Sequence, residues 1–276
     1  MNIWDKMQQV DRRIIYAVFL AAIVFPLLNP IGMPLSYSDT TISFYNEVEK
    51  LQAGDVVCMA LDYSPGGSPD VHPQAVVVTK HLLQKGVKMV FVSFWAAGPM
   101  YAEQIIQPYI ASGEMVNGEN VANLGYISGG STAIRRFGLD VAGTQPRDFY
   151  NKETTSLPIM KGIKDCRDFA LVIEFNSGSP GLGEWVQQVQ GPLGVKILSG
   201  SVTVNVPTNM PYVDAGQVIG LLQGLRGAAE YEVMSGNPGS AVAGMDAQSL
   251  GHIVVITFII LGNLGYFITG RHKKNV

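Results

Sequence analysis

Asp55-Val-Val-Cys-Met-Ala-Leu61 is followed by an amphipathic stretch of helix length, from 69 to 84, and then by a second apolar run, Lys88-Met-Val-Phe-Val-Ser-Phe-Trp95. Each apolar run has the length of a strand. Continuous apolar runs of this length are typical of strands that are covered on both faces, as in parallel sheets. Residues 55–95 therefore predict a strand, a crossover helix and a second, parallel strand.

The same alternation continues to residue 234. Further strands are expected at 121–126, 169–175 and 195–199, and further helices at 99–112, 131–137, 182–193 and 214–234. Apolar strands that alternate with helices favour a sheet with helices on both faces. The fold class predicted for residues 36–240 is therefore α/β, a Rossmann-like three-layer sandwich with a mainly parallel sheet. No internal repeat divides these residues, and their number suits one core.

An apolar segment lies at each end of this domain, at 14–35 and at 251–269. Each is close to the roughly 20 residues that a helix needs to cross a bilayer. We expect two transmembrane helices, with a linker at 241–250 that joins the domain to the second one. A cleaved signal peptide is the alternative for the first segment. Against this alternative, the residues after Asn29 offer no small-x-small cleavage site.

Basic residues flank the two apolar segments on their terminal sides. They are Lys6, Arg12, Arg13, Arg271, Lys273 and Lys274. On the sides that face the domain, the nearest cations are Lys50 and Arg226. Because cytoplasmic flanks are enriched in Lys and Arg, the tails at 1–13 and 270–276 are expected in the cytoplasm. The expected protein is a two-pass protein of the cell membrane with an extracytoplasmic domain.

The charge of the middle of the chain argues against nucleic acid as a partner. Six of the 19 Lys and Arg and two of the 22 carboxylates lie in the terminal segments, which leaves 13 cations against 20 carboxylates and a net charge of about −7. Contacts to nucleic-acid phosphates need clustered Lys or Arg. The partners that we expect instead are the lipid bilayer, further copies of the chain or other membrane-complex subunits, and a small-molecule ligand.

The chain has two cysteines, Cys58 and Cys166. Cys58 lies within an apolar run, which favours a buried, unmodified thiol. A disulfide between the two remains an alternative for a domain outside the cytoplasm. No Asn-x-Ser/Thr sequon occurs, which points weakly to a prokaryotic membrane.

Small and polar residues follow every expected strand. In open parallel sheets the ligand crevice lies outside the carboxyl ends of the strands, so these residues are candidates for ligand binding. They are Asp62, Ser64, Ser128, Gly129, Gly130, Ser131, Asn176, Ser177, Ser179 and Ser201. The alternative is that Gly, Ser and Pro act here only as turn and cap residues.

Catalytic signals are weak. Ser131, His72 and Asp62 could be drawn as a triad, but such a set can be found in almost any chain. No His, Cys, Asp or Glu cluster has metal-ligand spacing, and no P-loop or Gly-x-Gly-x-x-Gly motif occurs. The sequence therefore assigns no catalytic residue and no metal, and it leaves the cofactor unknown.

Gly216, Gly220 and Gly224 recur at four-residue intervals in the expected helix at 214–234. Each glycine inside a helix costs about 0.5 to 1 kcal/mol relative to alanine, so a close backbone contact is expected to compensate. That contact is either the domain's own sheet or a second protomer. Asn263, a polar residue within the second apolar segment, is also compatible with a homo-oligomer because amides in hydrocarbon usually face a partner.

Three functional hypotheses follow from these patterns. The leading one is an extracytoplasmic module that is anchored in the membrane, self-associates and has a structural or interaction role, with a small-ligand crevice at the strand ends. The first alternative is an extracytoplasmic hydrolase or transferase that uses Asp62 and the Ser-rich loops. The second is an accessory subunit of a larger membrane complex. The irregular segment at 138–168 is long for a connector, which favours a functional or interfacial role.

Overall fold

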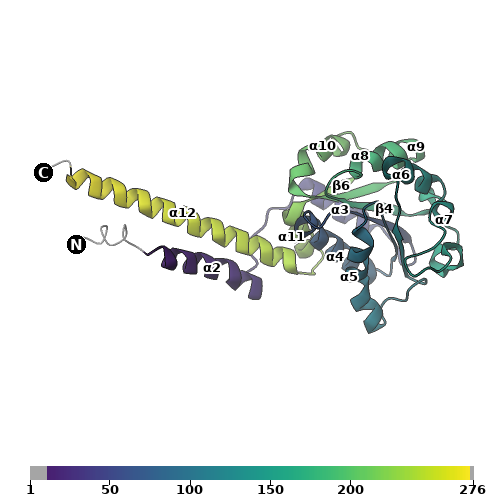
Figure 1. Ribbon diagram of the computed structural model, residues 1–276, viewed down its shortest axis with the longest axis horizontal. Helices are drawn as coiled ribbons and strands as arrows, with labels where there is room; N and C mark the ends of the chain where they lie inside the picture. The colour runs from purple at the N-terminus through teal and green to yellow at the C-terminus, as the bar shows by residue number, and fades with distance from the viewer. Residues whose placement is uncertain (1–10, 274–276) are drawn as a thin grey trace. The chain divides into compact units, whose positions relative to one another are not determined.

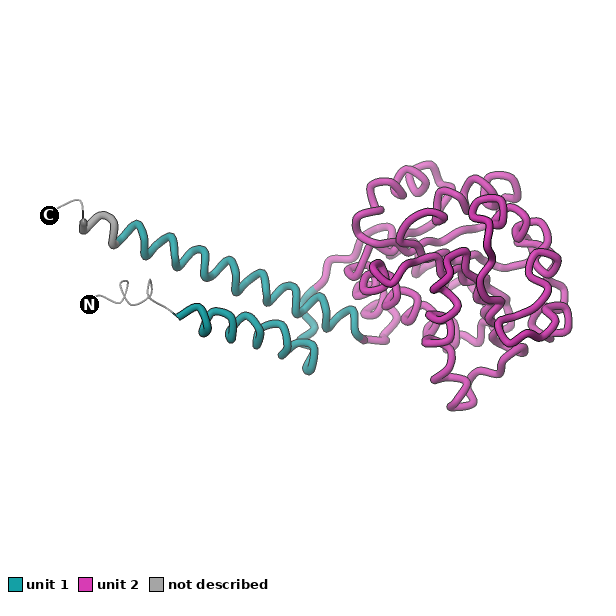
Figure 2. Tube along the Cα trace, in the orientation of Figure 1, with its two compact units in different colours: residues 1–34, 240–276 teal, residues 35–239 magenta. Residues whose placement is uncertain are grey.

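The computed structural model describes residues 11–273, with side chains up to residue 268. The chain forms two compact units, a helical unit of residues 1–34 and 240–276 and an α/β unit of residues 35–239 (Figure 2). The α/β unit spans almost the same residues as the expected domain. Of the two expected cytoplasmic tails, residues 1–10 with Lys6 and residues 274–276 with Lys274 lie outside the described residues.

One parallel sheet forms the centre of the α/β unit, in the order β3-β2-β1-β4-β5-β6 (Figure 1). The strands are β1 (Val56–Asp62), β2 (Lys88–Ser93), β3 (Val121–Tyr126), β4 (Leu171–Asn176), β5 (Ile197–Ser201) and β6 (Gly220–Gln223). This confirms the α/β class and the parallel sheet. The strand order reverses between β1 and β4, which pair from Val57 with Leu171 to Asp62 with Asn176.

Helices cover both faces of the sheet. The longer ones are α3 (Asp39–Glu49), α4 (Ser68–Gln84), α5 (Gly98–Ser112), α6 (Gly130–Leu139), α10 (Val206–Asp214) and α11 (Gly224–Met234). The short turns are α7 (Val141–Thr144), η1 (Thr154–Ser156), η2 (Pro158–Met160), η3 (Cys166–Asp168), α8 (Leu182–Trp185), η4 (Val186–Gln190), α9 (Gly191–Leu193) and η5 (Thr203–Asn205).

The core consists of two apolar clusters, one on each face of the sheet. Because successive strand residues point to opposite faces, Met59 of β1 packs with α3, α4, α5 and α11, whereas Cys58 and Ala60 pack with α6, α7 and α8. Cys58 and Cys166 are both buried free thiols. The irregular segment at 138–168 also packs on its own unit, through buried Val141 and Ile159 among others.

The expected helix at 214–234 is wrong. The chain leaves α10 at Asp214, turns at Gly216 with a φ of 71°, forms β6 and only then enters α11 at Gly224. Pairing with β5 buries Leu221 and Leu222 completely, and burial of this size overrides local helix propensity. The three glycines therefore do not share a helix face, and the interface that we inferred from such a face loses its geometric basis.

Two further helices lie where none was expected. α3 occupies the stretch between the first apolar segment and β1, with Ser38 as its N-cap, and it packs against β6. α10 contains two prolines, Pro207 in its first turn and Pro211 further along. A proline in the first helical turn costs little because the N–H it lacks has no partner there.

In the helical unit, α2 (Arg12–Leu28) lies beside α12 (Ser240–Lys273) (Figure 1). The linker expected at 241–250 is wrong, because these residues form the first turns of α12. Among the described residues, α12 is the one helix that is long and apolar enough to cross a membrane, over Ser240–Ile268. The first expected span, at 14–35, is not found, because α2 has only 17 residues and ends at Leu28. The helix ends there because Asn29 precedes a proline, and residues before a proline avoid helical backbone angles.

Asp246 of α12 fixes the chain that follows α2. One carboxylate oxygen accepts the backbone N–H groups of Ile31 and Gly32, each at 2.8 Å, and the other accepts that of Met33 at 3.0 Å. Asp246 is buried. A carboxylate that accepts three backbone N–H groups leaves none of them unsatisfied. Nearby, Gly251 allows Phe19 of α2 to approach α12 closely.

Candidate functional site

Asp62, at the carboxyl end of β1, is fully buried and does not line a crevice. One of its oxygens accepts the backbone N–H of Phe94 at 2.7 Å, and the other accepts the indole N–H of Trp185 at 2.9 Å. Burial raises the pKa of Asp62 to about 7, although the hydrogen bonds from Trp185 and Phe94 act in the opposite direction. The role of Asp62 in this structure is to join β1, the end of β2 and α8.

A layer of buried polar side chains extends from Asp62 across β4 and β5. Glu174 accepts the side-chain N–H of Asn176 and the hydroxyl of Ser199, both at 2.9 Å. Burial raises the pKa of Glu174 well above its usual range, and the charge of Asp62 raises it further. Asn176 and Ser201 are buried as well. The structure therefore places these two candidates inside the sheet, away from a ligand.

Ser64 and Ser177 meet where the strand order reverses. The Ser177 hydroxyl accepts the backbone N–H of Ser64 at 2.8 Å and lies 3.2 Å from its hydroxyl. A Cβ on Gly67 would lie 2.3 Å from the Ser177 Cβ, so the two loops are in close contact. Ser179 donates to Glu184 in the first turn of α8. These serines act as loop and cap residues in the described structure.

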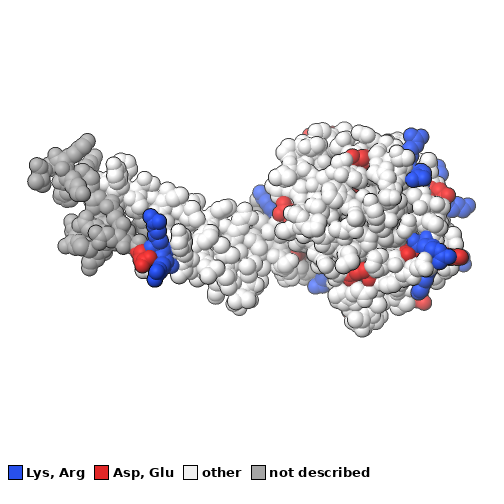
Figure 3. Space-filling view, in the orientation of Figure 1, with Lys and Arg blue, Asp and Glu red and all other residues white. Residues whose placement is uncertain are grey.

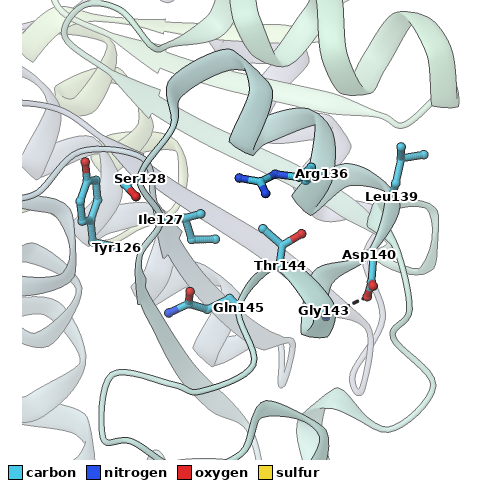
Figure 4. A pocket seen from close by; sticks show the side chains of 9 residues that line it. All are labelled: Tyr126, Ile127, Ser128, Arg136, Leu139, Asp140, Gly143, Thr144 and Gln145. Carbon is cyan, nitrogen blue, oxygen red and sulfur yellow. Dashed lines mark hydrogen bonds between the residues drawn. The ribbon is translucent and has the colours of Figure 1, made fainter.

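The remaining candidates lie at the end of β3, beside a cavity of about 490 Å³ (Figure 4). The residues that line it are Tyr126, Ile127, Ser128, Arg136, Leu139, Asp140, Gly143, Thr144 and Gln145. Ser128 is in the wall. The next two residues are Gly129, the N-cap of α6 with a φ of 121°, and Gly130, its first residue with a φ of 55°. Ser131 lies in the first turn of α6 but is not among the residues that line the cavity.

The cavity contains one cation and one carboxylate that do not pair. Asp140 accepts the backbone N–H of Gly143 at 2.9 Å and so caps α7. Gln145 donates to the carbonyl of Leu124 at 2.6 Å, which holds its side chain in the wall. Arg136 extends from α6 away from Asp140 and toward Ser128 (Figure 4). No hydrogen bond or ion pair of Arg136 is found among the described residues.

Sequence reasoning located Ser128 but missed Arg136, Thr144 and Gln145. The one signal for them was the length of the segment at 138–168, whose first residues form the far wall of the cavity. The triad of Ser131, His72 and Asp62 is not assembled: His72 Nδ1 lies 2.8 Å from the Tyr63 hydroxyl, and Asp62 has the partners given above. Among the described residues no group of three or more His, Cys, Asp or Glu could hold a metal ion.

Comparisons with family models, with curated proteins and with solved structures found no match to this chain. The strand order is that of doubly wound folds, in which ligands bind at the carboxyl ends of the strands. A fold of this kind hosts many unrelated functions, so function has to be argued from the site itself.

Proposed function

We propose that this protein is a membrane-anchored, extracytoplasmic binding module that takes a small polar ligand in the cavity at the end of β3. The observation that carries the proposal is the cavity, whose volume of about 490 Å³ is within the range of small-molecule sites. It lies at the carboxyl edge of the sheet and combines polar side chains with exposed apolar ones. Such a combination can both orient a ligand and bury its surface.

The membrane anchor of the proposal is α12, assisted by α2. Between residues 14 and 34 and between 240 and 268 the one Asp, Glu, Lys or Arg is Asp246, which is buried. In Figure 3 the described surface of the helical unit lacks Lys, Arg, Asp and Glu except near the start of α2. Together with the basic residues near both termini, this supports two spans and an extracytoplasmic α/β unit.

The cavity can be tested by filling it. We expect Thr144→Phe to occupy the cavity, and Thr155→Phe, at an exposed residue away from it, to serve as the matched control. A panel of small polar molecules is screened by thermal shift on the full chain in detergent. A ligand of the cavity should raise the Tm of the natural protein and of the control, and should leave Thr144→Phe unshifted. Equal shifts in all three proteins would contradict the proposal.

Self-association is the second part of the proposal, and Asn263 now supports it without the glycines. Its side chain is exposed on α12 and donates to the carbonyl of Ile259 at 2.8 Å, and its oxygen accepts no hydrogen bond from the described residues. An amide in hydrocarbon usually faces a partner helix. Light scattering in detergent should give a multiple of 29.8 kDa that Asn263→Leu reduces and Thr257→Leu does not. A monomeric natural protein would rule self-association out.

The enzyme alternative loses its main candidates in this structure. Asp62 is enclosed by its hydrogen-bond donors, and Ser64 and Ser177 contact each other. None of the three lines the cavity. The geometry therefore favours binding over catalysis at this edge of the sheet.

A further inference from the structure

We propose that the ligand of the β3 cavity carries an anionic group, a carboxylate or a phosphate on a small organic body, and that Arg136 binds this group. The inference rests on the proposed function, because it takes the cavity as the ligand site. It adds the chemical class of the ligand and the residue that selects it.

The direction of the Arg136 side chain is the first step. Side chains on a helix point back toward its N-terminus, and the Arg136 side chain does so. Its Nη2 lies 3.9 Å from the position that a Cβ would take on Gly129, the N-cap residue of α6. The guanidinium therefore lies near the beginning of its own helix and at the wall of the cavity (Figure 4).

The Arg136 side chain is exposed, and it lies beside a second group that attracts anions. The N-terminus of a helix carries a positive partial charge that favours anions, and no side chain caps the N-terminus of α6. The carboxylate of the cavity, Asp140, is engaged with Gly143 at the other end of the wall (Figure 4). An anion between Arg136 and the start of α6 would compensate both positive groups at once.

The rest of the cavity indicates the body of the ligand. Tyr126 and Leu139 are 44% and 54% exposed on its walls, so apolar surface remains available for packing. The hydroxyls of Ser128 and Thr144 lie in the same walls and can donate to oxygen atoms. A small organic acid or phosphate ester with a flat or apolar body fits this combination.

The test uses the full chain in dodecyl maltoside, in a buffer without phosphate or carboxylate. Phenyl phosphate is the probe, benzyl alcohol is its neutral counterpart, and binding is measured by calorimetry. We expect phenyl phosphate to bind one site and Arg136→Gln to weaken this binding by about tenfold to a hundredfold. Arg135→Gln is the matched control, because it removes the same charge from the neighbouring position of α6 and Arg135 does not line the cavity. It should leave the affinity unchanged.

Several results would overturn the inference. Equal weakening by the two arginine variants would show attraction to net charge only. Binding of benzyl alcohol that Thr144→Phe abolishes, without binding of phenyl phosphate, would refute the anionic class while leaving the proposed function intact. No binding of either probe, together with no hit in the thermal-shift panel, would refute both. Binding of dihexanoyl phosphatidylglycerol without phenyl phosphate would identify a lipid headgroup in place of a free ligand.

Discussion

Asp62 shows how burial decides the role of a single residue. A carboxylate at the end of a parallel strand is an ordinary candidate for ligand binding, and the sequence offered no reason to exclude it. In the structure, the indole of Trp185 covers it from α8, a segment about 120 residues further along the chain. Which loop covers a strand end depends on tertiary packing, and a single sequence does not display that packing.

The burial of Asp62 predicts a pH dependence of stability. Its pKa is about 7 in the folded protein and has an ordinary value of 3.8, so the folded state holds the proton more tightly than the unfolded state. This contribution is fully present below pH 3.8 and is lost as the pH rises through 7. Its size is about 4 kcal/mol at 1.36 kcal/mol per pKa unit. Glu174, whose pKa is also raised, acts in the same direction.

The measurement is the free energy of unfolding by urea between pH 4 and pH 8, in detergent. Asp62→Asn should flatten the fall in stability with pH, and Glu119→Gln, at an exposed carboxylate, should not. The asparagine can accept from only one of the two donors, Phe94 and Trp185, so the variant should also be less stable at pH 4. An unchanged slope in Asp62→Asn would show that Asp62 titrates alike in the folded and unfolded states.

At the level of elements, β6 shows where sequence patterns stop being informative. The five longer strands were predicted from apolar runs, each of which can be recognised from its own residues. Gly220-Leu-Leu-Gln is only four residues long, and its neighbours fit a helix. The strand forms because β5 and α3 provide partners for it. Similarly, the cavity brings together Ser128, Arg136 and Thr144, whose proximity arises only when the segment after α6 folds back.

Because Gly220 lies in a strand, replacing it with alanine should change the stability in the direction opposite to that expected for a glycine in a helix. A Cβ on Gly220 would lie 2.4 Å from the backbone N of Phe44 in α3, so Gly220→Ala should destabilise the protein by about 1 to 3 kcal/mol. In a helix the same substitution would stabilise it by about 0.5 to 1 kcal/mol. Gly216→Asn is the control, since no atom lies near its Cβ position and asparagine tolerates a positive φ. Urea unfolding decides the sign.

At the level of the whole molecule, the proposed membrane topology depends on α2. Its 17 residues span about 25 Å at 1.5 Å per residue, slightly less than the roughly 30 Å of hydrocarbon. The 29 residues of the candidate span in α12 extend over about 43 Å and suffice alone. A single span would leave the N-terminus on the side of the α/β unit. Two spans would bring Arg12 and Arg13 to the same side as the basic C-terminus, as the positive-inside rule requires.

Cysteine labelling with a reagent that does not cross membranes distinguishes these arrangements. Cys58 and Cys166 are buried, so the folded natural protein should remain unlabelled and serves as the control. Thr155→Cys should be labelled in intact cells, and Asn2→Cys and Asn275→Cys only after permeabilisation. If Asn2→Cys were labelled in intact cells while Asn275→Cys was protected, α12 would be the only span. Protection of Thr155→Cys together with labelling of Asn275→Cys would reverse the orientation, and the β3 cavity would then meet cytoplasmic ligands.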